Sequence, residues 1–267
     1  MIMRGRVWRW GAVMVFVAAS FVGCGDDEKG GEPAAEPVIV RGAGADAAAI
    51  AGFVQQYRDV LGDDNGGEPG TRGTSGYREL NWDSLPDEVC APNACPSDIF
   101  NAPTAPRARG IVLHTSGQAL MVSADSDNPT GTAPRFGNLN AHYPDAFKTY
   151  SPERLFSPVG SNLVEITFFV PGSSTPATVR GFGAVYCDVD THHTAFEYFD
   201  RNGNSLGEFE TPISNNGLSF LGVVFDEPIV YRVEVRYGTS VLGPDDGQDT
   251  DVAVMDNFIF AEPQPIP

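Results

Sequence analysis

From residue 78 onward the chain is a succession of short β-type runs separated by turn residues, and this pattern restricts the fold more than any other feature. Within residues 195–199, Phe196 and Tyr198 share one face, as in a half-buried strand. Asn202-Gly203 between two such runs is a strong signal for a two-residue hairpin. The predicted strands are residues 78–82, 110–115, 119–124, 163–170, 178–187, 194–200, 205–211, 219–225, 229–237 and 252–260. They predict an all-β fold, a jelly-roll β-sandwich over residues 77–263.

One segment before the strands has helical spacing. Residues 46–62 place apolar side chains on one face, with Asp46 able to cap the start and Gly62 able to end the helix. The apolar residues are Ile50, Phe53, Val54, Tyr57, Val60 and Leu61. We expect this amphipathic helix to dock on the sandwich, and binding to a partner is the alternative. Residues 24–45 are rich in Gly, Asp, Glu, Pro and Ala and predict a flexible acidic tether.

The N-terminus has the pattern of an export signal. A basic region with Arg4, Arg6 and Arg9 precedes an apolar stretch, residues 11–22, which is too short to span a bilayer. Residues 21–24, Phe-Val-Gly-Cys, resemble the lipobox of bacterial lipoproteins. The resemblance implies that residues 1–23 are a signal peptide and that Cys24 is lipidated. The protein would then be extracytoplasmic and held to a membrane by lipid, at the outer membrane in a Gram-negative host. An ordinary secretory signal is the alternative.

Net charge excludes one class of partner. The chain carries 17 Lys and Arg residues against 35 Asp and Glu residues. Because three of the arginines lie in the signal, cleavage would leave a net charge of about −21. Nucleic acid and anionic lipid headgroups repel such a chain, so no nucleic-acid partner is expected. The acidic residues can also supply oxygen ligands for calcium, with solubility alone as the alternative.

Three cysteines remain if Cys24 carries lipid. Cys90 and Cys95 bracket the turn-forming residues 91–94, and an exported protein can form disulfides. We therefore predict a Cys90–Cys95 disulfide and a free Cys187. Pairing of Cys187 with either of the others stays open, because connectivity does not follow from sequence.

Residues 101–161 contain few predicted strands and many Pro, Asn and aromatic residues. Long ordered loops on a β-scaffold often carry binding sites. Phe136, Tyr143 and Tyr150 are the aromatic residues that we expect to bind a ligand there. The alternative is that these side chains only pin the loop to the domain.

Several segments resemble a group of uncharacterised exported bacterial proteins, over about residues 45–263. They are residues 77–83, 85–87, 154–156, 168–172, 181–185, 188–190, 198–200, 218–223 and 254–258. The second half is also similar to jelly-roll modules of surface proteins that carry a PEP-type sorting tail. This chain ends in residues 262–267 without such a hydrophobic tail, so its anchor would be the N-terminal lipid. The resemblance implies a jelly roll and brings no established activity.

The closing strand resembles that of calcium-stabilised jelly-roll carbohydrate-binding modules. In those modules the aspartate that matches Asp256 is a calcium ligand, and Asp83 is the match for a second ligand. The resemblance thus implies a structural calcium ion. Satisfaction of Asp256 by backbone amides, or by an arginine such as Arg180, is the alternative. Asp188 and Asp190 form a second possible metal pair, or only an acidic turn cap.

The sequence lacks the usual motifs of hydrolytic and dinucleotide-binding enzymes. It has no Gly-x-Ser-x-Gly and no His-Glu-x-x-His, and residues 181–183 lack the third glycine of a dinucleotide loop. A pair of glycosidase carboxylates can neither be excluded nor assigned among so many acidic residues. We therefore expect non-catalytic binding of a glycan or another envelope component. A polysaccharide-degrading enzyme and a structural envelope lipoprotein are the alternatives.

Overall fold

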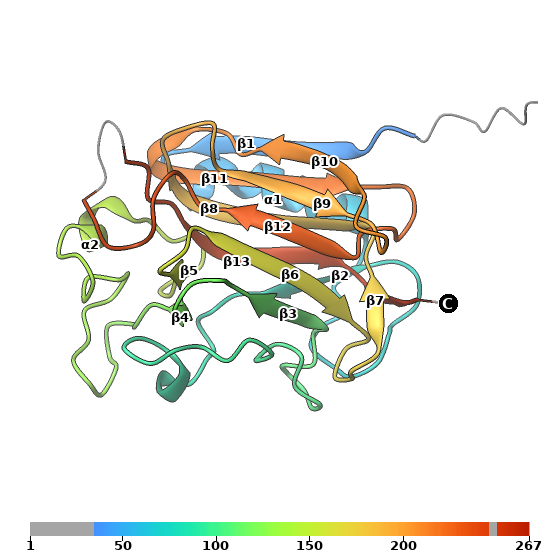
Figure 1. Cartoon of the computed structure of the whole chain (residues 1–267), viewed down its shortest axis with the longest axis horizontal. Helices are drawn as coiled ribbons and strands as arrows, with labels where there is room; N and C mark the ends of the chain where they lie inside the picture. The colour runs from blue at the N-terminus through green and yellow to red at the C-terminus, as the bar shows by residue number, and fades with distance from the viewer. Residues whose placement is uncertain (1–34, 246–249, 267) are drawn as a thin grey trace, which may run out of the picture. The chain divides into compact units, whose positions relative to one another are not determined.

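The computed structural model describes residues 35–245 and 250–266, which all lie in the unit Ala35–Pro267. The predicted signal peptide and Cys24 therefore lie outside the described residues. Two antiparallel β-sheets make up most of the unit, and one long helix packs on the first of them (Figure 1). This confirms the predicted mainly-β sandwich with a docked N-terminal helix. No described helix is long and apolar enough to cross a membrane.

The first sheet has the strand order β1-β11-β8-β13-β5-β4, and β2 also pairs with β13. Its long central strands are buried over most of their length, because the helix covers one side and the second sheet the other. The bounds are β1 Val38–Gly44, β2 Tyr77–Leu80, β4 Ala119–Val122, β5 Phe156–Val159, β8 Gly181–Val189, β11 Ser214–Val224 and β13 Val254–Ala261.

The second sheet has the order β10-β9-β12-β6-β7-β14, and β3 also pairs with β6. Its strands β6 and β12 alternate buried and half-buried residues, as expected for a sheet with one face on the core. The bounds are β3 Ile111–His114, β6 Leu163–Phe169, β7 Pro176–Thr178, β9 Ala195–Phe199, β10 Ser205–Glu210, β12 Arg232–Arg236 and β14 Gln264–Pro265. The long loop contains the short helix α2, Tyr143–Ala146, and a 3-10 turn spans Asp87–Val89.

Aromatic side chains fill the space between the two sheets. Phe182 of β8 meets Phe196 of β9 edge to face, with ring centroids 5.2 Å apart, and meets Phe258 of β13 at 5.5 Å. Edge-to-face pairs of this kind add to the stability that comes from burial alone. These contacts link strands of the two sheets through side chains that face the core.

Helix α1, Ala47–Leu61, lies against β1 and β11 on the outer side of the first sheet (Figure 1). Asp46 caps it as predicted, accepting a hydrogen bond from the Ala49 amide at 3.0 Å. Tyr57 is fully buried below the helix, where a Cβ on Gly222 would lie 2.4 Å from its ring. The missing side chain at Gly222 is what lets the helix approach the sheet so closely.

Residues 38–44 do not continue the predicted tether. They form strand β1, which pairs with β11 from Val38 opposite Val224 to Gly44 opposite Leu218. The run Val38-Ile39-Val40 has the β-branched character of a strand, and the surrounding Gly and Ala residues obscured that signal. The tether can therefore extend no further than residue 37.

Candidate functional site

The resemblance implies that Asp256 is a calcium ligand. In the structure, both oxygens of its side chain accept hydrogen bonds from the long loop. Oδ2 accepts hydrogen bonds from the backbone amides of Tyr150 at 2.6 Å and Ser151 at 3.2 Å. Oδ1 accepts from the Ser151 hydroxyl at 3.1 Å. Asp83 accepts from the Arg154 amide at 2.9 Å. Backbone amides therefore satisfy Asp256, as the alternative to calcium binding expects. These hydrogen bonds tie the long loop to β13.

Replacing Asp256 with Asn should flatten the pH dependence of stability. Burial raises the pKa of Asp256 from 3.8 to about 8, although the Tyr150 amide opposes the rise. A carboxyl group with a raised folded-state pKa holds its proton longer in the folded chain than in the unfolded one. Its contribution to stability is full below pH 3.8 and is lost as the pH rises to about 8. Each pH unit in that window should lower the free energy of unfolding by up to about 1.4 kcal/mol.

The substitution keeps the contacts, because an Asn side chain can accept from both amides and donate to the Ser151 hydroxyl. The measurement is urea unfolding between about pH 5 and pH 8 for wild type, Asp256→Asn and the exposed control Asp98→Asn. We expect a smaller slope only in Asp256→Asn. Equal slopes in all three proteins would show that Asp256 does not hold the extra proton.

The second acidic pair lies at the end of β8. Asp188 is buried in a left-handed conformation with φ 64° and accepts a hydrogen bond from the Asn216 amide at 2.6 Å. Asp190 accepts from the Asn215 side-chain amide at 2.9 Å. Burial raises the pKa of Asp188 to about 6, and the charges of Asp190 and Asp251 add to the rise. Asp251 was not predicted from sequence, and it joins this pair in space.

The predicted aromatic binding residues are part of the core. Phe136 is fully buried, and Tyr143 stacks on Phe147 with ring centroids 4.6 Å apart. The Tyr143 hydroxyl donates to the Pro244 carbonyl at 2.8 Å. Tyr150 is half-buried against the core. Phe136 and Tyr143 therefore pin the long loop to the domain, as the alternative expects, because a long loop needs apolar side chains of its own to stay ordered.

Residues of the same loop, together with Asp83, line two adjoining hollows that share Ser126 and Glu153. The first, of about 230 Å³, is lined by Asp83, Asp125, Ser126, Asp127, Pro152, Glu153 and Arg154. The second, of about 190 Å³, is lined by Ser126, Pro134, Arg135, Thr149 and Glu153. Glu153 accepts from the Ser126 amide at 2.7 Å and from its hydroxyl at 2.8 Å, so this contact stands between the hollows. We call the two together the Glu153 hollows.

Arg154 forms the floor of the first hollow. Its side chain is only 3% exposed and forms ion pairs with Asp87 and Asp125. Its Nη1 and the Asp125 Oδ1 are both buried without a hydrogen-bond partner among the described residues. Both atoms have almost no exposed surface, so they belong to the ion-pair cluster beneath the hollow and are not open to a ligand.

The predicted Cys90–Cys95 disulfide is not formed, and all three described cysteines are free and buried. The Cys90 thiol donates to the Pro86 carbonyl and the Cys95 thiol to the Pro96 carbonyl. Burial raises the pKa of Cys90 to about 11 and that of Cys95 to about 12. The amide of Cys95 donates to the Leu120 carbonyl of β4, so this segment is held to the sheet without a cross-link.

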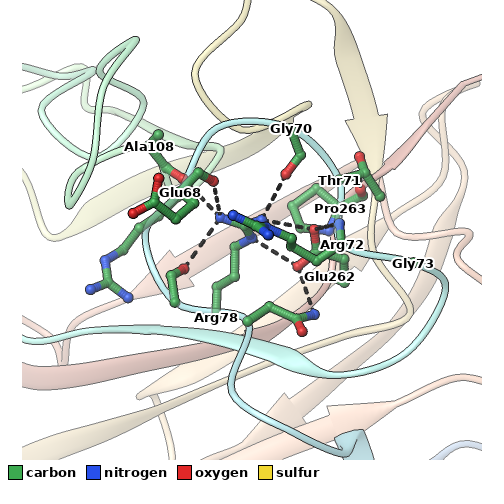
Figure 2. Close-up of polar contacts among 12 residues, drawn as sticks. Glu68, Gly70, Thr71, Arg72, Gly73, Arg78, Ala108, Glu262 and Pro263 are labelled. Atoms are coloured by element: carbon green, nitrogen blue, oxygen red, sulfur yellow. Dashed lines mark hydrogen bonds and ion pairs between the residues drawn. The ribbon is translucent and has the colours of Figure 1, made fainter.

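A buried polar cluster that was not predicted from the sequence surrounds Arg78 on β2 (Figure 2). Both Arg78 and Glu262 have side chains that are 0% exposed, and they pair at 2.8 Å. Arg78 also donates to the backbone carbonyls of Gly66, Glu68, Gly70 and Ala108. The signal was present, since strand alternation puts Arg78 on the same face as Leu80 and Trp82. This cluster organises the Gly-rich loop after α1 rather than an open site.

Metal binding is not preformed: in residues 35–245 and 250–266, no group of three or more His, Cys, Asp or Glu side chains is placed to hold a metal ion. The chain matches no known protein family and no curated protein. Among solved structures it is similar to the enzymatically active domain of tailspike protein 4 from bacteriophage CBA120. That match has a TM-score of 0.27 and 14% sequence identity, and it covers 62% of this chain and 20% of the tailspike chain. A similarity at this level assigns neither a family nor an activity.

Proposed function

We propose that the protein is a lipid-anchored, extracytoplasmic binding protein that recognises a glycan or another hydroxyl-rich envelope component without catalysis. The observation that carries the proposal is the pair of Glu153 hollows on the long loop. The sandwich behind them would be a jelly roll, as the sequence resemblance implies. The anchor would be the lipid on Cys24, with the outer membrane as its place in a Gram-negative host.

The chemistry of the hollows supports a hydroxyl-rich ligand. Carboxylates of Asp127 and Glu153 can accept hydrogen bonds from sugar hydroxyls. Because Asp83, Asp125, Asp127 and Glu153 outnumber the one arginine of the first hollow, a polyanionic glycan would be repelled. Neutral and amino sugars therefore fit best.

The rigid attachment of the loop supports the same function. Asp256 holds the amides of Tyr150 and Ser151, directly before the residues that line both hollows. Buried aromatic side chains hold the middle of the loop. A surface fixed in this way binds with little loss of conformational freedom, which favours affinity.

The test is an array of neutral, amino and anionic polysaccharides, with wild type and the double variant Asp127→Asn/Glu153→Gln. We expect saturable binding of neutral or amino glycans that weakens by about 10- to 100-fold in the variant, as for loss of a hydrogen bond to a charged group. The matched control Asp98→Asn changes an exposed carboxylate outside the hollows and should bind like wild type.

Three results would contradict the proposal. Release of reducing ends or unsaturated products from a bound glycan would indicate a polysaccharide-degrading enzyme. Binding that the double variant leaves unchanged would place the ligand elsewhere on the protein. No retained glycan and no product would favour a structural envelope lipoprotein without a small ligand.

A further inference from the structure

Two further hollows adjoin each other beside the turn between β11 and β12, and they share no residue with the Glu153 hollows. The lining of the first, of about 350 Å³, includes Arg180 and the turn residues 226–228. The lining of the second, of about 280 Å³, includes Pro228, Ile229, Ile266 and the hairpin residues 200–202. Because Pro228 belongs to both, the two form one groove, which we call the Arg180 groove. Volumes of this size suit a small molecule.

Arg180 supplies the groove with a cation that has no carboxylate partner. None of the described salt bridges includes Arg180. Its Nη2 donates to the carbonyls of Val60 and Leu61 at the end of α1, at 2.6 and 3.3 Å, so the side chain is held in place. Its Nε is buried, whereas Nη1 keeps exposed surface and has no hydrogen-bond partner among the described residues. Nη1 is therefore the donor that Arg180 offers to a ligand.

Two carboxylates of the same hollow restrict which anion can reach Arg180. Asp226 and Glu227 are both exposed, and neither is in a salt bridge with a described residue. The third acidic residue of the lining, Glu262, is already paired with Arg78. Phosphate or a dicarboxylate would be repelled by Asp226 and Glu227. A zwitterion would not, since its carboxylate can pair with Arg180 while its ammonium group pairs with these carboxylates.

The second hollow adds an apolar surface next to this charged pair. Ile229 is 40% exposed, although isoleucine is usually buried in a folded protein. It lines the hollow together with Ile266 and Pro228. An apolar group placed there would remove these side chains from water, which favours binding. The groove thus offers a cation, two carboxylates and an apolar surface in adjoining places.

We propose that the Arg180 groove binds one free α-amino acid with an apolar side chain. The carboxylate of the ligand accepts a hydrogen bond from Nη1 of Arg180, and its ammonium group donates to Asp226 or Glu227. Its side chain extends past Pro228 and covers Ile229 in the second hollow. The site does not depend on glycan binding, because the Arg180 groove and the Glu153 hollows have separate linings.

The experiment is calorimetric titration of the protein with L-leucine and with three analogues. L-leucinamide lacks the carboxylate, N-acetyl-L-leucine lacks the ammonium group, and L-serine lacks the apolar side chain. We expect one L-leucine per chain, with each analogue binding about 10-fold more weakly or not at all. Absence of a binding heat with L-leucine at about 10 mM overturns the proposal. Equal binding of L-leucine and L-leucinamide also overturns it, since the carboxylate would then play no part.

Variants test the roles of the charged residues. Arg180→Gln should weaken binding of L-leucine by about 10- to 100-fold, whereas the control Arg41→Gln, an exposed arginine on β1, should bind it like wild type. Equal weakening in both variants would contradict a site at Arg180.

Because Arg180 also binds the end of α1, a second variant keeps the test independent of folding. Asp226→Asn/Glu227→Gln should weaken binding of L-leucine but strengthen binding of the anion N-acetyl-L-leucine, since it removes both an ammonium partner and a repulsion. A loss of structure cannot produce these opposite changes. If the double variant changes binding of neither ligand, the ammonium group does not lie at Asp226 and Glu227 and the proposal fails.

Discussion

Replacing Arg78 with Met should lower the free energy of unfolding by about 3 to 5 kcal/mol, the cost of leaving a buried charge without its partner. Glu262 would stay buried, and its carboxylate would keep only two hydrogen-bond donors. These are the Arg72 amide at 2.7 Å and the Asn65 side chain at 2.9 Å. The carbonyls that Arg78 binds in the Gly-rich loop would also lose a donor. Each buried acceptor left unpaired adds to the loss.

A second arginine provides the matched control. Arg58 makes a similar two-point contact with Glu79, but the two side chains are 19% and 17% exposed, so water competes for the contact. Arg58→Met should therefore cost about 1 kcal/mol or less. Urea unfolding of both variants measures the difference. Equal losses in the two variants would contradict the stated role of Arg78.

A further double variant tests the source of the loss. Adding Glu262→Gln to Arg78→Met removes the unpaired charge, so it should recover part of the stability that the single variant loses. A double variant less stable than Arg78→Met would mean that Glu262 is stabilised by its other donors and that the ion pair is not the main cause.

Replacing Trp82 with Ala should cost about 3 to 5 kcal/mol, as for other large aromatic residues in a core. Trp82 is fully buried and stacks on Phe156 with ring centroids 4.3 Å apart. It also meets Phe258 and Phe100 edge to face at 5.1 and 5.5 Å. Its indole N–H donates to the Asp256 carbonyl at 2.8 Å. The substitution therefore removes packing and a buried hydrogen bond together.

Trp82→Phe separates these two contributions. Phenylalanine keeps most of the ring contacts but leaves the Asp256 carbonyl without its donor, so we expect a smaller loss of about 1 to 3 kcal/mol. Thermal and urea unfolding of both variants measure the free energies. A Trp82→Ala variant as stable as Trp82→Phe would show that the rings around residue 82 repack without it.

Strand alternation predicted most of the sandwich, and its failures have local causes. The predicted strand 178–187 is split into β7 and β8, and Val179, which links them, forms an isolated bridge with Val230. Strand β5 was missed because Pro158 interrupts its pattern. The helix was predicted to within one residue at each end, since its caps and its apolar face agree.

The site was less predictable than the fold, because its residues have no shared spacing in the sequence. Glu153 and Ser126 meet only because the long loop folds back on itself. Asp251 joins Asp188 only because β13 pairs with β8. The aromatic residues of the loop were conspicuous in the sequence, yet burial of Phe136 and Tyr143 shows that they stabilise the loop. Such partners depend on tertiary contacts, which a periodic pattern does not encode.

The most direct test of the proposed function is a crystal structure of the protein with a glycan that it retains on the array. We predict a sugar in the Glu153 hollows, with its hydroxyls hydrogen-bonded to Asp127 or Glu153. A sugar bound at a place that shares no residue with these hollows, such as the surface lined by Asp200 and Ile229, would contradict it.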